Sequence, residues 1–529
     1  MNKPLLLSLA AAVVLGTNLN AETMYERIQA MELQMKQMQQ ELERLKAEKS
    51  NAAVADDKAE DDEAMAAADE DTDAEDADTE DEEEESIEDI VEEMQENIAE
   101  LNKNTNSNHL KFGVDYRFAV DNLHYKMADG SKQNNNAFMT NRLWINMNWA
   151  ATRHLSFTGQ LAYNKAFGAR SGVTSPGYET FDWIANENAY DDQLRVRSAY
   201  FLYKDTDFFG VDMPWTFSVG RRPSTNGHLV NLRDDDRAAS PMGHNINVEF
   251  DGASAKFGLE NLTGIDGMYV KFCAGRGMSN AAPRFNSAPY ADTTSNASID
   301  LVGLIFTPWS DGQYTINTQY YYAANLIDAV NPSLPSAGFN TVGNLHAFTA
   351  NFVANGIGDG LSDYLDETTF FISGAISKTD PDAGQRMLYG ATDEFGNPTQ
   401  TGESKTGHSY WAGLQMPSLI SEEGKWGVEY NHGSKYWRSI TYGEDTNIGS
   451  KLAARGDAYE VYFTEYLVED ILSMQIRYTY IDYDYTGSNG FFGETTGAAY
   501  RINDMRNSAQ ASQIVDKAQD IRFYLRYRY

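Results

Sequence analysis

Apolar and polar residues alternate in short stretches between residues 109 and 529. In the segment FGVDYRFAV (112–120), large apolar side chains occupy every second position, with small or charged residues between them. This period of two is typical of a β-strand with one apolar face and one polar face. About sixteen such stretches occur, at 111–121, 141–150, 154–165, 193–203, 215–221, 247–259, 267–276, 298–307, 313–323, 344–354, 368–377, 408–416, 425–431, 457–466, 471–482 and 521–529.

A soluble β-sandwich also alternates, so the last stretch is more informative. It carries an aromatic and aliphatic face opposite an arginine-rich face, and the sequence ends on an aromatic residue. We expect this strand to close a barrel against the first strand and to act as a sorting signal for the barrel assembly machinery. Its apolar face consists of Ile521, Phe523, Leu525, Tyr527 and Tyr529.

The two faces suit two different surroundings. The apolar positions fit lipid, and the polar positions fit a water-filled interior. Residues 109–529 are therefore predicted to form an all-β transmembrane antiparallel barrel of about 16 strands, within a range of about 14 to 18.

The N-terminal residues are typical of an export signal. Lys3 precedes an apolar run from Leu5 to Leu15, and Ala21 provides a small residue for cleavage, so residues 1–21 are predicted to be a signal peptide. No later apolar run reaches roughly 18 residues, which argues against a membrane-spanning helix. We expect the mature chain to lie in the outer membrane of a Gram-negative cell, with its N-terminal segment in the periplasm.

Residues 22–50 carry a heptad pattern, which predicts a short periplasmic coiled coil and, with it, a homotrimer. The alternative is a single amphipathic helix lying on another surface. A second amphipathic helix and a polar hinge are predicted at 86–108. The core positions of the coiled coil would be Ile28, Met31, Met35, Met38, Leu42 and Leu45.

The negative charge of the chain is concentrated in one segment. The formal net charge is −36, and residues 56–100 hold 25 acidic residues and one base. Residues 51–85 form an acidic low-complexity linker with too little apolar surface to fold, so we expect disorder there. This charge argues against nucleic-acid binding, and it favours cations or a basic periplasmic partner instead.

Motifs for catalysis or cofactor binding are sparse. The single cysteine, Cys273, excludes an intramolecular disulfide and a multi-cysteine metal site. The eight histidines show no H-E-x-x-H spacing, and neither a G-x-S-x-G elbow nor a phosphate-binding loop stands out. We therefore expect no enzymatic activity, no cofactor and no metal site.

Two groups of charged residues are candidates for controlling what the barrel passes. The first lies on the predicted lumen face, where opposed charges would bias selectivity unless they simply pair with one another. It consists of Asp115, Arg117, Arg142, Arg477, Arg522, Arg526 and Arg528.

The second group flanks a predicted turn, PSTNG (223–227), that leads into a loop. Folded into the barrel, this loop would narrow the pore and offer guanidinium groups to carboxylate, phosphate or other oxyanions. The adjacent acids at 234–236 provide the alternative, because they would pair with these arginines. The group consists of Arg221, Arg222, Arg233 and Arg237.

Five segments carry a resemblance to a known family. The chain resembles an uncharacterised family of porin-like bacterial outer-membrane β-barrel proteins, a domain of unknown function with an N-terminal coiled coil. The resemblance covers 109–529 and the coiled coil, and it implies a porin-like barrel with no settled activity. The segments are HLKFGVDYRF (109–118), GRRPSTNG (220–227), NLRDDDR (231–237), FDGASAKF (250–257) and RGDAYEVYFTEY (455–466).

Together these patterns predict a porin-like channel for passive diffusion of small hydrophilic solutes or ions. Two alternatives remain open. The barrel would act as an anchor or sleeve for a periplasmic partner such as a redox protein, although the chain has no C-x-x-C-H haem motif of its own. It would otherwise be a surface adhesin that presents long loops near 166–192 and 485–520.

Overall fold

The computed structural model describes most of the chain beyond residue 110. The predicted signal peptide, coiled coil, acidic linker and second helix with its hinge all lie outside the described residues and stay predictions. The described residues are 111–167, 194–279, 298–331, 338–358, 360–393, 395–421, 423–441, 444 and 446–529.

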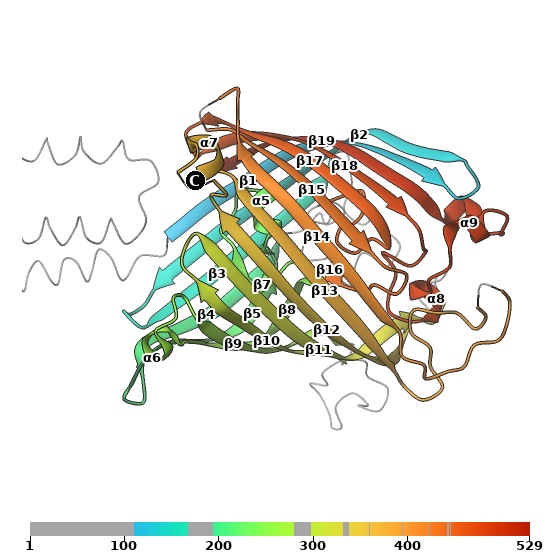
Figure 1. The fold of residues 1–529 in the computed structure, drawn as a ribbon, viewed down its shortest axis with the longest axis horizontal. Helices are drawn as coiled ribbons and strands as arrows, with labels where there is room; N and C mark the ends of the chain where they lie inside the picture. The colour runs from blue at the N-terminus through green and yellow to red at the C-terminus, as the bar shows by residue number, and fades with distance from the viewer. Residues whose placement is uncertain are drawn as a thin grey trace, which may run out of the picture. The chain divides into compact units, whose positions relative to one another are not determined.

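The strands in this part of the chain form one closed antiparallel barrel (Figure 1). Sixteen strands make up its wall. Each wall strand pairs with the next one along the chain, and the last pairs with the first. The wall strands are β1 (Lys111–Met127), β2 (Lys132–Ala150), β3 (Leu155–Ala166), β4 (Arg195–Phe208), β5 (Val211–Ser224), β8 (Ile246–Gly258), β9 (Tyr269–Ser279), β10 (Ser298–Ser310), β11 (Tyr314–Ala329), β12 (Phe339–Asn355), β13 (Thr369–Pro381), β14 (Thr406–Pro417), β15 (Lys425–Gly433), β17 (Gly456–Val468), β18 (Leu472–Tyr483) and β19 (Val515–Arg528).

Each predicted stretch corresponds to one of these strands, so the predicted fold class and strand number are confirmed. The barrel closes where β19 pairs with β1, with Tyr116 opposite Tyr527. Val114 and Tyr529 extend this pairing through two backbone hydrogen bonds of 2.7 and 2.9 Å. The predicted closure by the C-terminal strand is therefore confirmed.

The alternation along each strand separates an apolar outer face from a polar inner face. In β13, Ile372 and Ile376 are 48% and 52% exposed on the outside, whereas Ser373 and Ala375 are buried inside. The same alternation places Phe523, Leu525 and Tyr527 of β19 on the outer face and Arg522 and Arg526 on the inner face. A strand with period two cannot present both sets to the same surroundings.

Aromatic side chains gather near both ends of the outer face. Near the end of the barrel that holds Tyr529, the ring centroids of Tyr203 and Trp215 lie 5.3 Å apart. Near the opposite end, Tyr430 lies 5.1 Å from Tyr459, which continues to Tyr480 at 6.4 Å. Two aromatic girdles therefore flank the apolar band.

The two ends of the barrel differ in the length of their connections. Short turns lie at the end that holds the C-terminus and α7, and α8 and α9 lie at the other end (Figure 1). Within the part of the chain that the structure describes, no helix is long and apolar enough to cross a bilayer. The helical elements other than α5 are α6 (Glu260–Thr263), α7 (Asp363–Asp366), α8 (Glu494–Gly497), α9 (Ile502–Met505) and the 3-10 helix η2 (Ala511–Gln513).

Two long connections turn into the lumen. The first inner loop, residues 225–245 between β5 and β8, contains β6 (Gly227–His228), α5 (Val230–Arg233) and β7 (Ala239–Met242). The predicted loop after the PSTNG turn thus does fold into the barrel.

The second inner loop, residues 434–455 between β15 and β17, contains β16 (Ile440–Thr441). Ile440 and Thr441 pair in parallel with Ile246 and Asn247 of β8. Ile440 and Ile246 belong to the main apolar core, which lies inside the barrel towards the long-loop end.

Two buried arginines fix the second inner loop to the β18–β19 loop. Arg438 donates to the backbone carbonyls of Ser488 and Gly490 at 2.9 and 3.0 Å. Arg455 donates to the carbonyls of Thr486 and Gly497 at 2.9 and 2.8 Å. These bonds satisfy carbonyl groups that irregular backbone would otherwise leave unpaired inside the barrel.

Candidate functional site

The lumen wall around β1 and β19 carries most of the predicted charged residues. Alternation places them on the inner face, where each is at most 5% exposed, except that the Arg528 side chain is 27% exposed. The six buried residues are Asp115, Arg117, Arg142, Arg477, Arg522 and Arg526.

Most of these charges lie beside an opposite charge. Asp115 accepts from Arg526 Nε at 3.0 Å and lies 3.3 Å from Arg142 Nη2. Arg522 Nε lies 2.8 Å from an Asp121 carboxylate oxygen. The acids and bases of this wall are neighbours on adjacent strands and pair with one another. They do not form two sets of opposite charge that face each other across the lumen.

The first inner loop is held against this wall by its acidic residues. Asp236 lies 2.9 Å from Arg526 Nη2 and 3.0 Å from Arg528 Nη1. Asp235 accepts from Lys425 Nζ at 2.7 Å. The acids at 235 and 236 thus bind wall cations rather than the arginines next to them in sequence.

Arg233 and Asp234 reach a buried charge cluster behind the first inner loop. Burial alone would raise the pKa of Asp234, but the positive charges of Arg233 and Arg477 hold that pKa well below its usual range. Arg233 Nη1 lies 3.4 Å from Glu460 of β17. The loop is therefore docked as an ionised segment.

Lys451 of the second inner loop completes this cluster. Its Nζ donates to Glu429 Oε2 at 2.5 Å and also to Glu460. Glu429 accepts a further bond from the Trp411 indole at 2.9 Å. Both inner loops thus dock on the same buried wall carboxylate, Glu460.

His244 fixes the end of the first inner loop to the opposite wall. Its Nδ1 lies 2.8 Å from the Ser373 hydroxyl and its Nε2 lies 2.9 Å from the Ser409 hydroxyl. The ring packs against Trp411 and Trp437. Burial lowers the pKa of His244 to about 3, so the docked imidazole is neutral at neutral pH.

Acidification is expected to loosen this contact. The free side chain has a pKa near 6.5, so the undocked loop binds a proton more readily than the docked loop. Docking should therefore weaken about tenfold per pH unit below roughly 6.5, until the docked group also titrates near pH 3. Hydrogen exchange of residues 239–245, measured from pH 7.5 to pH 4.5, checks this.

His244→Asn provides the matched control because asparagine does not titrate. Its hydrogen exchange, corrected for intrinsic rates, should depend less steeply on pH than that of the unsubstituted protein. Equal slopes in the two proteins would contradict the role of His244.

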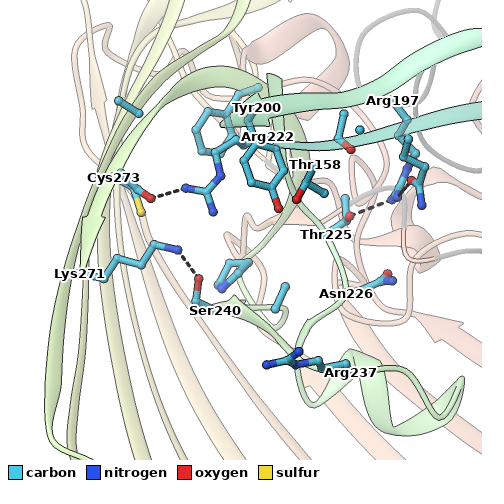
Figure 2. A pocket seen from close by; sticks show the side chains of 18 of the residues that line it. Thr158, Arg197, Tyr200, Arg222, Thr225, Asn226, Arg237, Ser240, Lys271 and Cys273 are labelled. Carbon is cyan, nitrogen blue, oxygen red and sulfur yellow. Dashed lines mark hydrogen bonds between the residues drawn. The ribbon is translucent and has the colours of Figure 1, made fainter. Parts of the chain in front are cut away.

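Between the first inner loop and the β2–β5 and β8–β10 wall lies a chamber of about 400 Å³ (Figure 2). Arg197, Arg222, Arg237 and Lys271 line it, and none of the described lining residues is acidic. The remaining lining is mainly amide, hydroxyl and small side chains, with the single cysteine, Cys273, on the β9 wall. The chamber is thus polar and cationic.

Arg222 is positioned from two neighbouring strands. Its Nη1 donates to the hydroxyls of Ser218 and Ser254, which face each other across β5 and β8. Its guanidinium lies 4.9 Å from the centroid of the Tyr200 ring. These contacts orient the group and leave its charge in place.

Glycines allow the strands of this wall to approach closely. Gly220, Gly252 and Gly275 lie side by side across β5, β8 and β9. A Cβ at Gly220 would lie 2.3 Å from the carbonyl oxygen of Ala199, and the φ of Gly220 is +140°. Only glycine fits there.

A second cavity of about 370 Å³ continues towards the end of the barrel that holds Tyr529. Val114, Arg528 and Tyr529 line it. It shares four lining residues with the chamber, which are Asn146, Gln160, Asn226 and Arg237. The two cavities are therefore adjacent parts of the lumen.

The structure separates the four arginines that the sequence grouped around the turn. Arg222 and Arg237 enter the chamber, whereas Arg233 lies in the buried cluster. Arg221 belongs to β5 and pairs with Glu249 at 3.0 Å, away from the chamber lining. Alternation along β5 explains why adjacent arginines diverge.

Sequence reasoning missed Lys271, Tyr200 and Lys451. Lys271 lies two residues before Cys273 and therefore on the same face of β9, so the alternation of the strand alone would have placed it in the lumen. Lys451 lies in a loop without periodicity, and nothing in the sequence signals its position. Among the described residues, no group of three or more His, Cys, Asp or Glu side chains is arranged to hold a metal ion.

Comparisons with known proteins give a family and several structures. A family model described as "Protein of unknown function (DUF3373)" matches residues 132–529. Among curated proteins, none matches the chain.

Solved structures similar to this chain include three outer-membrane proteins. OmpT of Vibrio cholerae (in-vitro folded, trimer form) is 13% identical, with 80% of this chain and 100% of that chain covered and a TM-score of 0.42. Pseudomonas putida OprB is 12% identical, with 79% and 94% covered and a TM-score of 0.41. OmpF of Salmonella typhi, in complex with daunomycin, is 10% identical, with 79% and 97% covered and a TM-score of 0.40.

Proposed function

This chain belongs to the family described as "Protein of unknown function (DUF3373)", and we propose that its barrel is a porin-like channel in a bacterial outer membrane. Small hydrophilic solutes or ions would diffuse passively through its lumen. The observation that carries the proposal is a polar chamber inside a wall whose outer face is apolar and flanked by two aromatic girdles. The chamber adjoins the second cavity, which lies towards the end of the barrel that holds Tyr529.

Recordings from planar lipid bilayers test this function. The purified full-length chain should insert in discrete steps, and each step should add a steady ohmic current. Folded protein that enters the bilayer without adding current would overturn the proposal. Insertion is checked separately by the protection of the barrel from added protease in lipid vesicles.

The outer face provides a second test, of membrane insertion itself. Ile376→Arg places a charge in the middle of the apolar band. It should destabilise the folded barrel in vesicles by about 2–4 kcal/mol. Leu419, which is 82% exposed in the turn between β14 and β15, lies outside that band. Leu419→Arg should therefore cost much less, as measured by urea titration in vesicles. Equal costs would argue against insertion of the band in lipid.

A second function, as an anchor or sleeve for a periplasmic partner, is favoured by the two inner loops. Arg438, Arg455 and His244 fix irregular backbone inside the barrel, as expected for a lumen that is partly filled. An anchor with a sealed lumen would give no steady current in the same recordings. Bilayer conductance therefore separates the two functions.

A further inference from the structure

Resting on the proposed channel function, we propose that the chamber is a binding site for small oxygen-bearing anions that makes the channel anion-selective. The ligands would be phosphate-like or sulfate-like oxyanions or small carboxylates. Arg222, Lys271 and Arg237 would hold them. These cations come from three separate elements, which are β5, β9 and the first inner loop.

Among the described residues, no carboxylate forms an ion pair with these three cations. Arg526, Arg233 and Lys451 each lie within 3.5 Å of an acidic oxygen. Arg222 contacts only hydroxyls and an aromatic ring among the described residues. The Lys271 ammonium donates to the Ser240 hydroxyl of the first inner loop.

Arg197 shows the contrast within the chamber itself. Its Nε lies 3.0 Å from Glu249, so its charge is compensated. Its Nη1 and Nη2 donate to Gln160 and Thr225 at 2.6 and 2.8 Å, which fixes the first inner loop beside the chamber. Arg197 thus builds the chamber wall, whereas the charges of Arg222, Lys271 and Arg237 are left for a ligand.

The surroundings of Arg222 favour an anion over simple solvation. Its Nη1 is occupied by Ser218 and Ser254, and the rest of the guanidinium fork faces the chamber (Figure 2). Lys271, which is 8% exposed, lies on the same wall (Figure 2). Guanidinium and ammonium groups held close together without a counter-charge attract anions, and Arg or Lys groups inside pores select for anions and phosphate.

The size of the chamber sets the class of ligand. A volume of about 400 Å³ lies near the lower end of the range for small-molecule sites. It would hold a hydrated oxyanion or a short dicarboxylate together with a few waters. The polar lining from Asn146, Gln160 and Thr158 offers further hydrogen bonds.

The first experiment measures reversal potentials of the full-length channel in asymmetric KCl. The unsubstituted channel should prefer chloride to potassium. In Arg222→Gln/Lys271→Gln, the anion-to-cation permeability ratio should fall about tenfold, which corresponds to about 1.4 kcal/mol in the energy of the anion in the pore. An unchanged ratio would overturn the inference.

Arg221→Gln is the matched control. It removes one positive charge at the residue next to Arg222 in the same strand, where the side chain pairs with Glu249 and Asp251 instead of lining the chamber. Its permeability ratio should stay close to that of the unsubstituted channel. An equal fall in this variant would show that net charge, rather than the chamber, sets the selectivity.

The second experiment does not depend on current. Cys273 is the only cysteine of the chain and lines the chamber, so it reports on what enters. An anionic methanethiosulfonate reagent should modify it faster than a cationic one, and the ratio of the two rates should fall in Arg222→Gln/Lys271→Gln. Equal rates with both reagents in the unsubstituted protein would overturn the inference.

Competition identifies the anion class. Inorganic phosphate and succinate are each titrated against the anionic reagent, and the one that slows modification at the lower concentration marks the preferred chemistry. If neither slows the reaction, the proposed site is wrong. A protein that shows anion-selective labelling but no conductance would refute the channel function while it supports the site, so the two failures are distinguishable.

Discussion

Lys451→Met is expected to release the second inner loop from the barrel wall, at a cost of about 3–5 kcal/mol in docking free energy. Lys451 is the shared partner of Glu429 and Glu460, and all three side chains are at most 4% exposed. Removing the ammonium leaves two carboxylates facing each other away from water. Hydrogen exchange of residues 446–455 should rise strongly, while exchange in the wall strands stays slow.

A second substitution separates lost charge compensation from lost packing. Glu429→Gln/Lys451→Met also removes the charge of Glu429, whose ion pair is with Lys451. Glu460 keeps Arg233 at 3.4 Å and Arg477 at 3.9 Å as partners. The double variant should therefore recover much of the docking that the single variant loses. If the double variant is as loose as the single one, packing rather than charge holds the loop.

Asp235→Asn/Asp236→Asn is expected to free the first inner loop and to raise single-channel conductance severalfold. Asp236 binds Arg526 and Arg528. Removing its charge should account for most of the lost docking free energy, on the order of 3 kcal/mol. The side chains of Asp235 and Lys425 are each just over a third exposed, so their ion pair contributes little to the docking of the loop. Once released, the loop no longer bounds the chamber.

The matched control for conductance is Asp251→Asn. Asp251 also pairs with an arginine, but its side chain is 66% exposed and it does not line the chamber. Conductance should stay unchanged in this variant. Unchanged conductance in Asp235→Asn/Asp236→Asn as well would mean that the first inner loop does not limit the current.

Strand parity explains why so much of the wall was predictable. The residues of β13 and β19 alternate between lipid-suited and water-suited side chains, and this alternation alone places Arg522 and Arg526 inside. The same reasoning separates Arg221 from Arg222, although the two were first grouped with a loop. Parity is a local property of the chain, so one sequence is enough to read it.

The loops were predictable only in outline. The sequence showed that a loop follows the PSTNG turn and that the acids at 234–236 had a choice of partners. The partners of Asp236, which are Arg526 and Arg528, lie about 290 residues further along the chain. No local pattern specifies such a contact, because it depends on the closure of β19 against β1.

The sequence by itself determined the class of the barrel, its strand positions and the face of each wall residue, because these follow from a repeat of two in the backbone. Only the tertiary structure decided which lumen charges are neutralised. Charge pairing depends on strand register and on where the inner loops dock, and both bring together residues that are remote in sequence. It is this difference that leaves Arg222, Lys271 and Arg237 without a carboxylate partner among the described residues, in the chamber beside the first inner loop.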